Sequence, residues 1–216
     1  MSGKALLFGL PRGGIYFGLC PDTIKSVAMS PITHFLIGWV TANTAKLNRR
    51  ERAIVTLAGV IPDVDGLGII AEIATRHSQK PLTWWSDYHH VLGHNLGFCL
   101  LVTVLAFLLA RQRWKTALLA CVSFHLHLLC DVIGARGPDN HQWPIPYLLP
   151  FSNAWQWTWP GQWMLNAWQN LAITSVALAI TIYLAWKRGY SPLEMFSPKA
   201  DAAFVQTLRR RFPSPN

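Results

Sequence analysis

The most informative segment of this chain reads Phe124-His125-Leu126-His127-Leu128-Leu129-Cys130-Asp131. It lies in an apolar run from Ala117 to Gly134. A run of this length is typical of a helix that spans a membrane or is deeply buried. Polar groups in such a helix are costly unless they are paired, protonated or bound to a metal. The polar side chains of this segment therefore need partners from elsewhere in the chain.

His127 and Asp131 are four residues apart, so a helix places them on one face. An imidazole nitrogen and a carboxylate oxygen on one face provide half of a metal site. A buried histidine that only hydrogen-bonds a neighbouring acid is the alternative. His125 lies about 200° around the helix from His127. We expect His125 to serve in packing or in supporting a ligand, off the face of the metal site.

The composition indicates a membrane-embedded protein. Charged residues make up only 13% of the 216 residues, against about 25% in a typical soluble domain. The net charge is +9, but the basic residues fall in short clusters beside apolar segments, as membrane topology signals do. The clusters are Lys46–Arg52, Arg111–Lys115, Lys187-Arg188 and Arg209–Arg211. This distribution argues against nucleic-acid binding.

The sequence predicts an all-α fold: a multi-helix, membrane-embedded bundle of about four to five apolar helices with a Pro/Trp-rich loop. The loop spans Arg136–Gly161, where prolines exclude a regular helix. Ser30 and Pro31 form a helix start. The predicted apolar segments are Pro31 to about Lys46, Ala53–Ala74, Leu96–Ala110, Ala117–Gly134 and Trp168–Trp186.

Three parts are predicted along the chain. Residues 1–28 are a poorly defined N-terminal extension, for which a cleaved signal peptide is an alternative. Residues 29–188 form the membrane-embedded domain, and residues 189–216 form a polar, basic tail. The four cysteines include no C-x-x-C pair, so no disulfide framework is expected. Those in apolar runs are expected to behave as small hydrophobic residues.

Two carboxylates interrupt the second apolar segment, in Pro62-Asp63-Val64-Asp65-Gly66. Carboxylates in apolar surroundings are expensive unless a cation meets them. If this turn is extended, alternate side chains point the same way. Asp63 and Asp65 would then share a cation. An ordinary Asp-Gly turn is the alternative.

Three histidines lie at the mouth of the apolar segment that begins near Leu96. On a helix, His90 and His94 are one turn apart. If the helix starts later, His89 and His94 converge, one from the loop and the other from the helix. His34 is a further histidine near the start of the first predicted helix.

These polar residues are predicted to lie on one side of the membrane. If the basic loops face the cytoplasm, the histidines and aspartates fall at the opposite ends of their helices, which is the periplasmic side in a bacterium. Histidine and aspartate side chains collected on one face favour zinc or a similar divalent ion.

At these residues the sequence resembles a family of bacterial inner-membrane metal-dependent hydrolases (YdjM-like). The matching positions are Thr33-His34, Pro62-Asp63-Val64-Asp65, His89 with His94, His127 with Asp131, Trp143-Pro144 and Pro150-Phe151. His90 stands where the family pattern has Arg, and Asn95 stands where it has Ser. The family is in turn similar to zinc-dependent phospholipase C and P1-type nucleases, which are all-helical. Further zinc ligands of those enzymes have no clear counterpart after Asp131.

The resemblance implies a multi-pass protein of the bacterial inner membrane, with the lipid bilayer as its partner. Its implied activity is hydrolysis of a phosphoester or lipid-like substrate through a metal-activated water, with zinc as the cofactor. The implied metal ligands are Asp63, Asp65, His89, His94, His127 and Asp131. Asp65 would also be a candidate general base, and His34 would be a ligand or would orient one.

A non-catalytic membrane protein that binds a metal or haem, or only holds helices together, is the alternative function. Haem would need two histidines facing each other, such as His94 and His127, and the neighbouring carboxylates argue against it. An intramembrane metalloprotease is disfavoured because the sequence contains no His-Glu-x-x-His.

Overall fold

A computed structural model describes residues 31–137 and 141–213. Within these ranges the chain forms eight α-helices and no β-strand, so the predicted all-α class is confirmed. The proposed N-cap Ser30 and the N-terminal extension lie outside the described residues.

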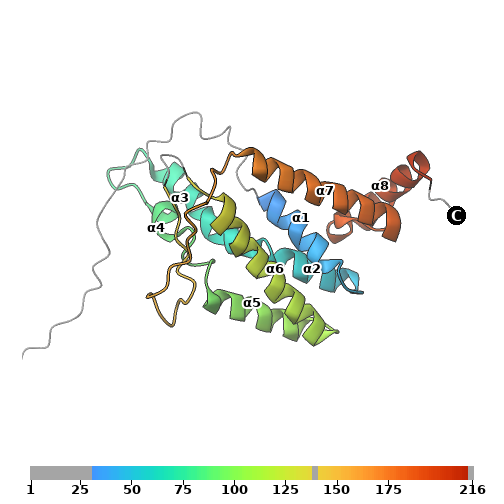
Figure 1. The fold of residues 1–216 in the computed structure, drawn as a ribbon, viewed down its shortest axis with the longest axis horizontal. Helices are drawn as coiled ribbons and strands as arrows, with labels where there is room; N and C mark the ends of the chain where they lie inside the picture. The colour runs from blue at the N-terminus through green and yellow to red at the C-terminus, as the bar shows by residue number, and fades with distance from the viewer. Residues whose placement is uncertain (1–30, 138–140, 214–216) are drawn as a thin grey trace, which may run out of the picture.

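The helices pack around α6 (Figure 1). Helix α5 lies along one side of α6, while α1 and α2 contact it from the other, and α7 packs on α1. The elements are α1 (Pro31–Ala42), α2 (Arg49–Ala58), the 3-10 helix η2 (Ile61–Leu67), α3 (Gly68–Thr75), α4 (Trp84–Tyr88), α5 (Leu96–Leu109), α6 (Arg113–Gly134), α7 (Trp168–Arg188), the 3-10 helix η4 (Pro192–Met195) and α8 (Pro198–Arg211).

Fewer helices can cross a membrane than the sequence predicted. Among the described residues, α6 and α7 are long and apolar enough, and a third span results if α2 is counted together with Ile61–Thr75, which is bent from it by 51°. The predicted four to five is therefore too high. Helix α1 ends at Ala42 after 12 residues and α5 has 14 residues. At 1.5 Å per residue, both are shorter than a hydrocarbon core of about 30 Å.

Small residues bring α1, α2 and α6 into close contact. A Cβ atom on Gly38 of α1 would lie 2.8 Å from the carbonyl oxygen of Thr56 in α2. A Cβ atom on Gly59, at the end of α2, would lie 2.6 Å from Ser123 Oγ of α6. Close backbone approach through small residues is typical of membrane helix packing. The three helices therefore form a tight unit.

Glu51 joins the basic segments at one end of the bundle. Its carboxylate is fully buried and accepts hydrogen bonds from the backbone amides of Arg111 (3.1 Å) and Gln112 (2.7 Å). It also closes a capping box with Asn48 at the start of α2. The turn before α6 is thereby fixed against the start of α2. Helices α3 and α4 lie toward the opposite end of the bundle (Figure 1).

The predicted polar tail contains helical structure. Residues 189–216 include η4 and α8, which begins after Ser197, whose side chain accepts a hydrogen bond from the amide of Ala200. Ser followed by Pro is a helix-start signal, and it marks this helix in the sequence. Glu194 of η4 pairs with the Arg52 guanidinium through contacts of 2.6 and 2.8 Å. The tail is therefore attached to α2.

The Pro/Trp-rich segment between α6 and α7 is irregular in its described residues, as predicted. Ile145 is fully buried and forms an antiparallel bridge with Trp157. The carbonyl oxygens of Tyr147 and Leu149 accept hydrogen bonds from the first amides of α5, at 2.7 and 2.9 Å. The segment thus caps α5, whose N-terminal amides have no partner within the helix.

Candidate metal centre

His127 and Asp131 share one face of α6, as their spacing predicts, and both are buried. His127 Nδ1 lies 2.9 Å from the carbonyl oxygen of Gly59. Because a carbonyl oxygen can only accept, Nδ1 carries the proton and Nε2 presents a lone pair. That Nε2 faces Asp131 Oδ2 at 3.0 Å. The break after α2 therefore fixes the ring in a ligand-ready tautomer.

His94 is oriented in the same way by Asp65. Its Nδ1 lies 3.0 Å from Asp65 Oδ2, which also accepts the backbone amide of Gly93 at 2.9 Å. The other oxygen of Asp65 contacts His89 Nδ1 at 3.0 Å. Helix α5 begins only at Leu96, with Asn95 as its N-cap, so the histidines come from a loop. Both oxygens of Asp65 are thus engaged in positioning imidazole rings and a loop.

Three ligand atoms form a small triangle. His94 Nε2 lies 3.1 Å from His127 Nε2 and 3.3 Å from Asp131 Oδ2, and the third edge is 3.0 Å. Tetrahedral zinc with bonds of 2.0–2.1 Å requires edges of about 3.3 Å. Asp131 Oδ2 is buried without a well-formed hydrogen bond. Two facing imidazole nitrogens and a carboxylate oxygen at these separations need a proton or a metal ion between them, so the residues fit a divalent cation.

Asp63 and His34 complete the cluster. Asp63 Oδ1 lies 3.6 Å from His127 Nε2, and Asp63 Oδ2 has no hydrogen-bond partner. His34 Nε2 lies 3.3 Å from Asp131 Oδ1, and the His34 ring packs on the His127 ring with centroids 3.8 Å apart. With His127 and Asp131, these two residues form a group whose ligand atoms all lie within 4.8 Å of one another, and His34 also contacts the second oxygen of Asp131.

The two carboxylates of η2 point to different partners. The segment is a 3-10 helix rather than an extended turn. Three residues per turn place side chains two residues apart about 240° from each other. Asp63 therefore faces His127, whereas Asp65 faces His89 and His94. The two do not point the same way, as an extended turn would have required.

His90 is a member of the cluster that the sequence pattern did not single out as a ligand. It is buried, has a left-handed φ of 64°, and packs on His94 with ring centroids 4.5 Å apart. It shares with His94 and Asp131 a second group of atoms close enough for a metal. Burial, with the charges of His94 and His89, lowers the pKa of His90 well below its usual value. His90 is therefore neutral and does not replace the arginine of the family pattern as a cation.

The charge balance of the cluster also favours a cation. Within the described chain, every ion pair of Asp63, Asp65 and Asp131 is with a histidine. Burial alone would lower the pKa of His94, but hydrogen bonds to Asp131 and Asp65 outweigh it and raise that pKa to about 9. The raised pKa favours a proton on His94, so a proton and a metal ion would compete for this ring.

The two most exposed side chains of the cluster mark its open side. Asp63 and His89 have 21% and 17% of their side chains exposed, whereas those of His94 and His127 are fully enclosed. Trp85 stacks on His89 with centroids 5.4 Å apart, so α4 borders this opening. Solvent therefore reaches the cluster between η2 and the loop that carries His89.

A cluster of buried imidazoles and carboxylates from four segments, in a helical chain with membrane-length helices, defines a membrane protein with a candidate divalent-metal centre. A family model described as YdjM inner membrane protein matches residues 29–197, and the chain belongs to this family. Comparison with curated proteins and with solved structures gives no match.

Proposed function

We propose that this protein is a membrane-bound, metal-dependent hydrolase that acts on a phosphoester or lipid-like substrate. The observation that supports it best is the triangle of His94 Nε2, His127 Nε2 and Asp131 Oδ2, with edges of 3.0–3.3 Å. Nitrogen and oxygen ligands in a compact, buried arrangement suit zinc.

The roles follow from the contacts. His94, His127 and Asp131 would hold the metal, and the partly exposed Asp63 would be the fourth ligand on the open side. When bound, a zinc ion would supply Lewis-acid chemistry for hydrolysis at this position. Asp65 keeps its oxygens on His89 and His94, so its contribution is to orient rings rather than to bind the ion. His34 likewise orients the carboxylate of Asp131 rather than binding the ion.

The surroundings of the opening favour a lipid-like substrate. Val64, Leu67 and Leu92 are neighbours of the site residues in sequence, and their side chains are 44%, 58% and 58% exposed. Exposed apolar groups around a polar centre suit a ligand that has both a polar group and an acyl chain. The choice of a phosphoester rests only on the expected resemblance to zinc-dependent phospholipase C and P1-type nucleases, and the comparison with solved structures gives no match to them.

The site is proposed to face the periplasm. Asp131 lies 18 residues along α6 from Arg113, which is about 27 Å at 1.5 Å per residue. That separation approaches the thickness of a hydrocarbon core. If the basic end lies in the cytoplasm, the centre lies at the opposite interface of the inner membrane.

Metal content and turnover test this function together. The full chain is purified in detergent, loaded with Zn²⁺, and assayed on chromogenic phosphomonoesters and phosphodiesters and on phospholipid vesicles. We expect Zn²⁺-dependent hydrolysis that is lost in Asp131→Asn and His127→Gln and kept in His77→Ala, a matched control with an exposed histidine outside the cluster.

Two outcomes would contradict the proposal. Absence of bound divalent metal under metal-replete conditions would remove its basis. Bound metal without turnover on any of these substrates would leave a non-catalytic metal-binding protein. Haem binding is disfavoured because the two Nε2 atoms, 3.1 Å apart with Asp131 against both, leave no room for a porphyrin plane between them.

A further inference from the structure

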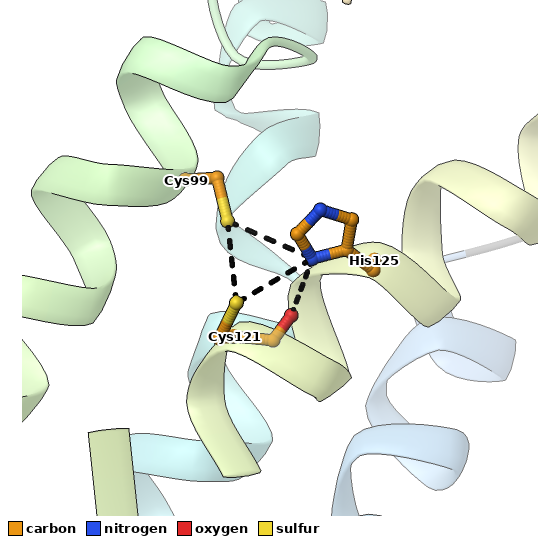
Figure 2. Close-up of side chains that lie close together, drawn as sticks. All are labelled: Cys99, Cys121 and His125. Carbon is orange, nitrogen blue, oxygen red and sulfur yellow. Dashed lines mark hydrogen bonds between the residues drawn. The ribbon is translucent and has the colours of Figure 1, made fainter. Parts of the chain in front are cut away.

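A second cluster of ligand-type side chains lies between α5 and α6 (Figure 2). Cys121 and His125 are one turn apart on α6, and Cys99 faces them from α5. This face of α6 points away from the one that carries His127, as the helical spacing predicts. Cys99 is 1% exposed, and the other two are half-buried. Neither cysteine forms a disulfide, so the cluster consists of two free thiols and one imidazole.

The spacing of the three ligand atoms matches a metal coordination sphere. The two sulfur atoms are 4.0 Å apart, and His125 Nδ1 lies 3.8 Å from Cys99 Sγ and 3.6 Å from Cys121 Sγ. With Zn–S bonds of 2.3 Å and Zn–N bonds of 2.0–2.1 Å, a tetrahedral ion requires a sulfur–sulfur edge of about 3.8 Å and sulfur–nitrogen edges of about 3.6 Å. The observed edges differ from these by less than about half an ångström.

We propose that Cys99, Cys121 and His125 form a second metal site, which binds a thiophilic ion of the Zn²⁺ class and links α5 to α6. Two thiolates and one imidazole are soft to borderline ligands, unlike the carboxylate-rich centre built around Asp131. The fourth position is left to water or another small ligand, as in zinc sites with three protein ligands.

Tyr147 supports this site from the loop that caps α5. Its hydroxyl lies 2.8 Å from His125 Nε2. Without metal, His125 Nδ1 donates to the carbonyl oxygen of Cys121 at 2.8 Å, and Nε2 accepts the tyrosine proton. With metal on Nδ1, the proton moves to Nε2 and the same hydroxyl accepts it. A hydroxyl that serves both tautomers is the outer partner that a metal-bound histidine requires.

Cobalt substitution tests the site in the presence of the first centre. The full chain, with its thiols reduced, is titrated with Co²⁺ in detergent. We expect a near-ultraviolet sulfur-to-cobalt charge-transfer band, which the His/Asp centre cannot produce because it has no thiolate. The band is lost in Cys99→Ser and Cys121→Ser and persists in Cys130→Ser and Asp131→Asn. Tyr147→Phe weakens binding about 10-fold or more.

X-ray absorption on the Zn²⁺-loaded wild-type protein provides a readout that needs no variant. We expect a sulfur shell at about 2.3 Å. A wild-type protein with reduced thiols that shows neither this shell nor the cobalt band overturns the proposal, as does a band that survives in both cysteine variants. If a serine variant fails to fold, the wild-type sulfur shell decides alone.

Discussion

Asp65 illustrates how a buried acid can act on a metal without touching it. Its oxygens are engaged by His89, His94 and the amide of Gly93. Loss of such an outer partner typically reduces metal affinity by about 10–100-fold. We therefore expect Asp65→Asn to weaken Zn²⁺ binding by that factor, whereas Asp131→Asn abolishes it. Competition with a chromogenic chelator measures both. Equal losses in the two variants would show that Asp65 is itself a ligand.

The proton on His94 predicts a pH dependence of metal binding. In the metal-free protein the pKa of His94 is raised from 6.5 to about 9. The stabilisation by this proton is complete below pH 6.5 and is lost as pH rises through 9. Zn²⁺ needs the neutral ring. Between pH 7 and 9, affinity should therefore increase about tenfold per pH unit, with one proton released.

Calorimetry in buffers of different ionisation enthalpy counts that proton directly. Asp87→Ala, which changes an exposed acid outside the cluster, serves as the control and should leave the proton count unchanged. An affinity that is constant across this pH range would contradict the assignment of the proton to His94.

At the scale of elements, the close approach of α2 and α6 depends on a missing side chain. A Cβ atom on Gly59 would lie 2.6 Å from Ser123 Oγ, which has no hydrogen-bond partner. Overpacking of this kind costs about 1–3 kcal/mol. We expect Gly59→Ala to destabilise the protein by that amount and the added change Ser123→Ala to restore most of it. The free energy of unfolding is measured in one detergent for the wild type, Gly59→Ala, Ser123→Ala and the double variant, which completes a double-mutant cycle. A double variant as unstable as Gly59→Ala would contradict the packing argument.

The attachment of the C-terminal helices depends on one buried ion pair. Arg52 and Glu194 have side chains only 9% and 8% exposed, and the guanidinium also lies over the Tyr190 ring. Removing one partner of a buried pair leaves an uncompensated charge and costs about 3–5 kcal/mol. We expect Glu194→Ala to destabilise the protein by this amount, and Arg52→Leu with Glu194→Leu to cost much less. Thermal unfolding compares them, and equal losses would show that the pair is not coupled.

At the scale of the whole molecule, the arrangement of the basic segments predicts its orientation. Glu51 ties the turn before α6 to the start of α2, and Arg188 donates to Asn43 Oδ1 at the end of α1. Three of the four basic segments thus lie at one end. With that end in the cytoplasm, green fluorescent protein fused after Asn216 should fluoresce, and alkaline phosphatase fused there should be inactive. The reverse result would place the centre on the cytoplasmic side.

The sequence predicted the all-α class and which residues gather in the cluster. It did not predict the number of spanning helices or the role of each residue in the cluster. The i, i+4 spacing of His127 and Asp131 was enough to place them on one face, because that spacing follows from helix geometry alone. The number of spans was too high because hydrophobicity does not reveal where a helix ends: the break at Gly59 and the early end of α1 at Ala42 depend on packing between helices.

The roles within the cluster needed three-dimensional contacts. The sequence could not show that both carboxylate oxygens of Asp65 contact imidazole rings. It also could not show that the ring of His90 is buried and neutral. The grouping of Cys99 with Cys121 and His125 was also out of reach, since it depends on which face of α5 meets α6. Such pairings between distant segments are set by tertiary packing, which local periodicity does not encode.

The order in which the ligands appear along the chain has a consequence for biogenesis. His34, Asp63 and His94 are synthesised before α6, whereas His127 and Asp131 arrive with it. Asp131 supplies an oxygen to the triangle and another to His34. The centre therefore cannot close until α6 has left the ribosome and entered the bilayer. A metal ion bound by His127 and Asp131 would therefore be acquired only after α6 has packed against the earlier segments.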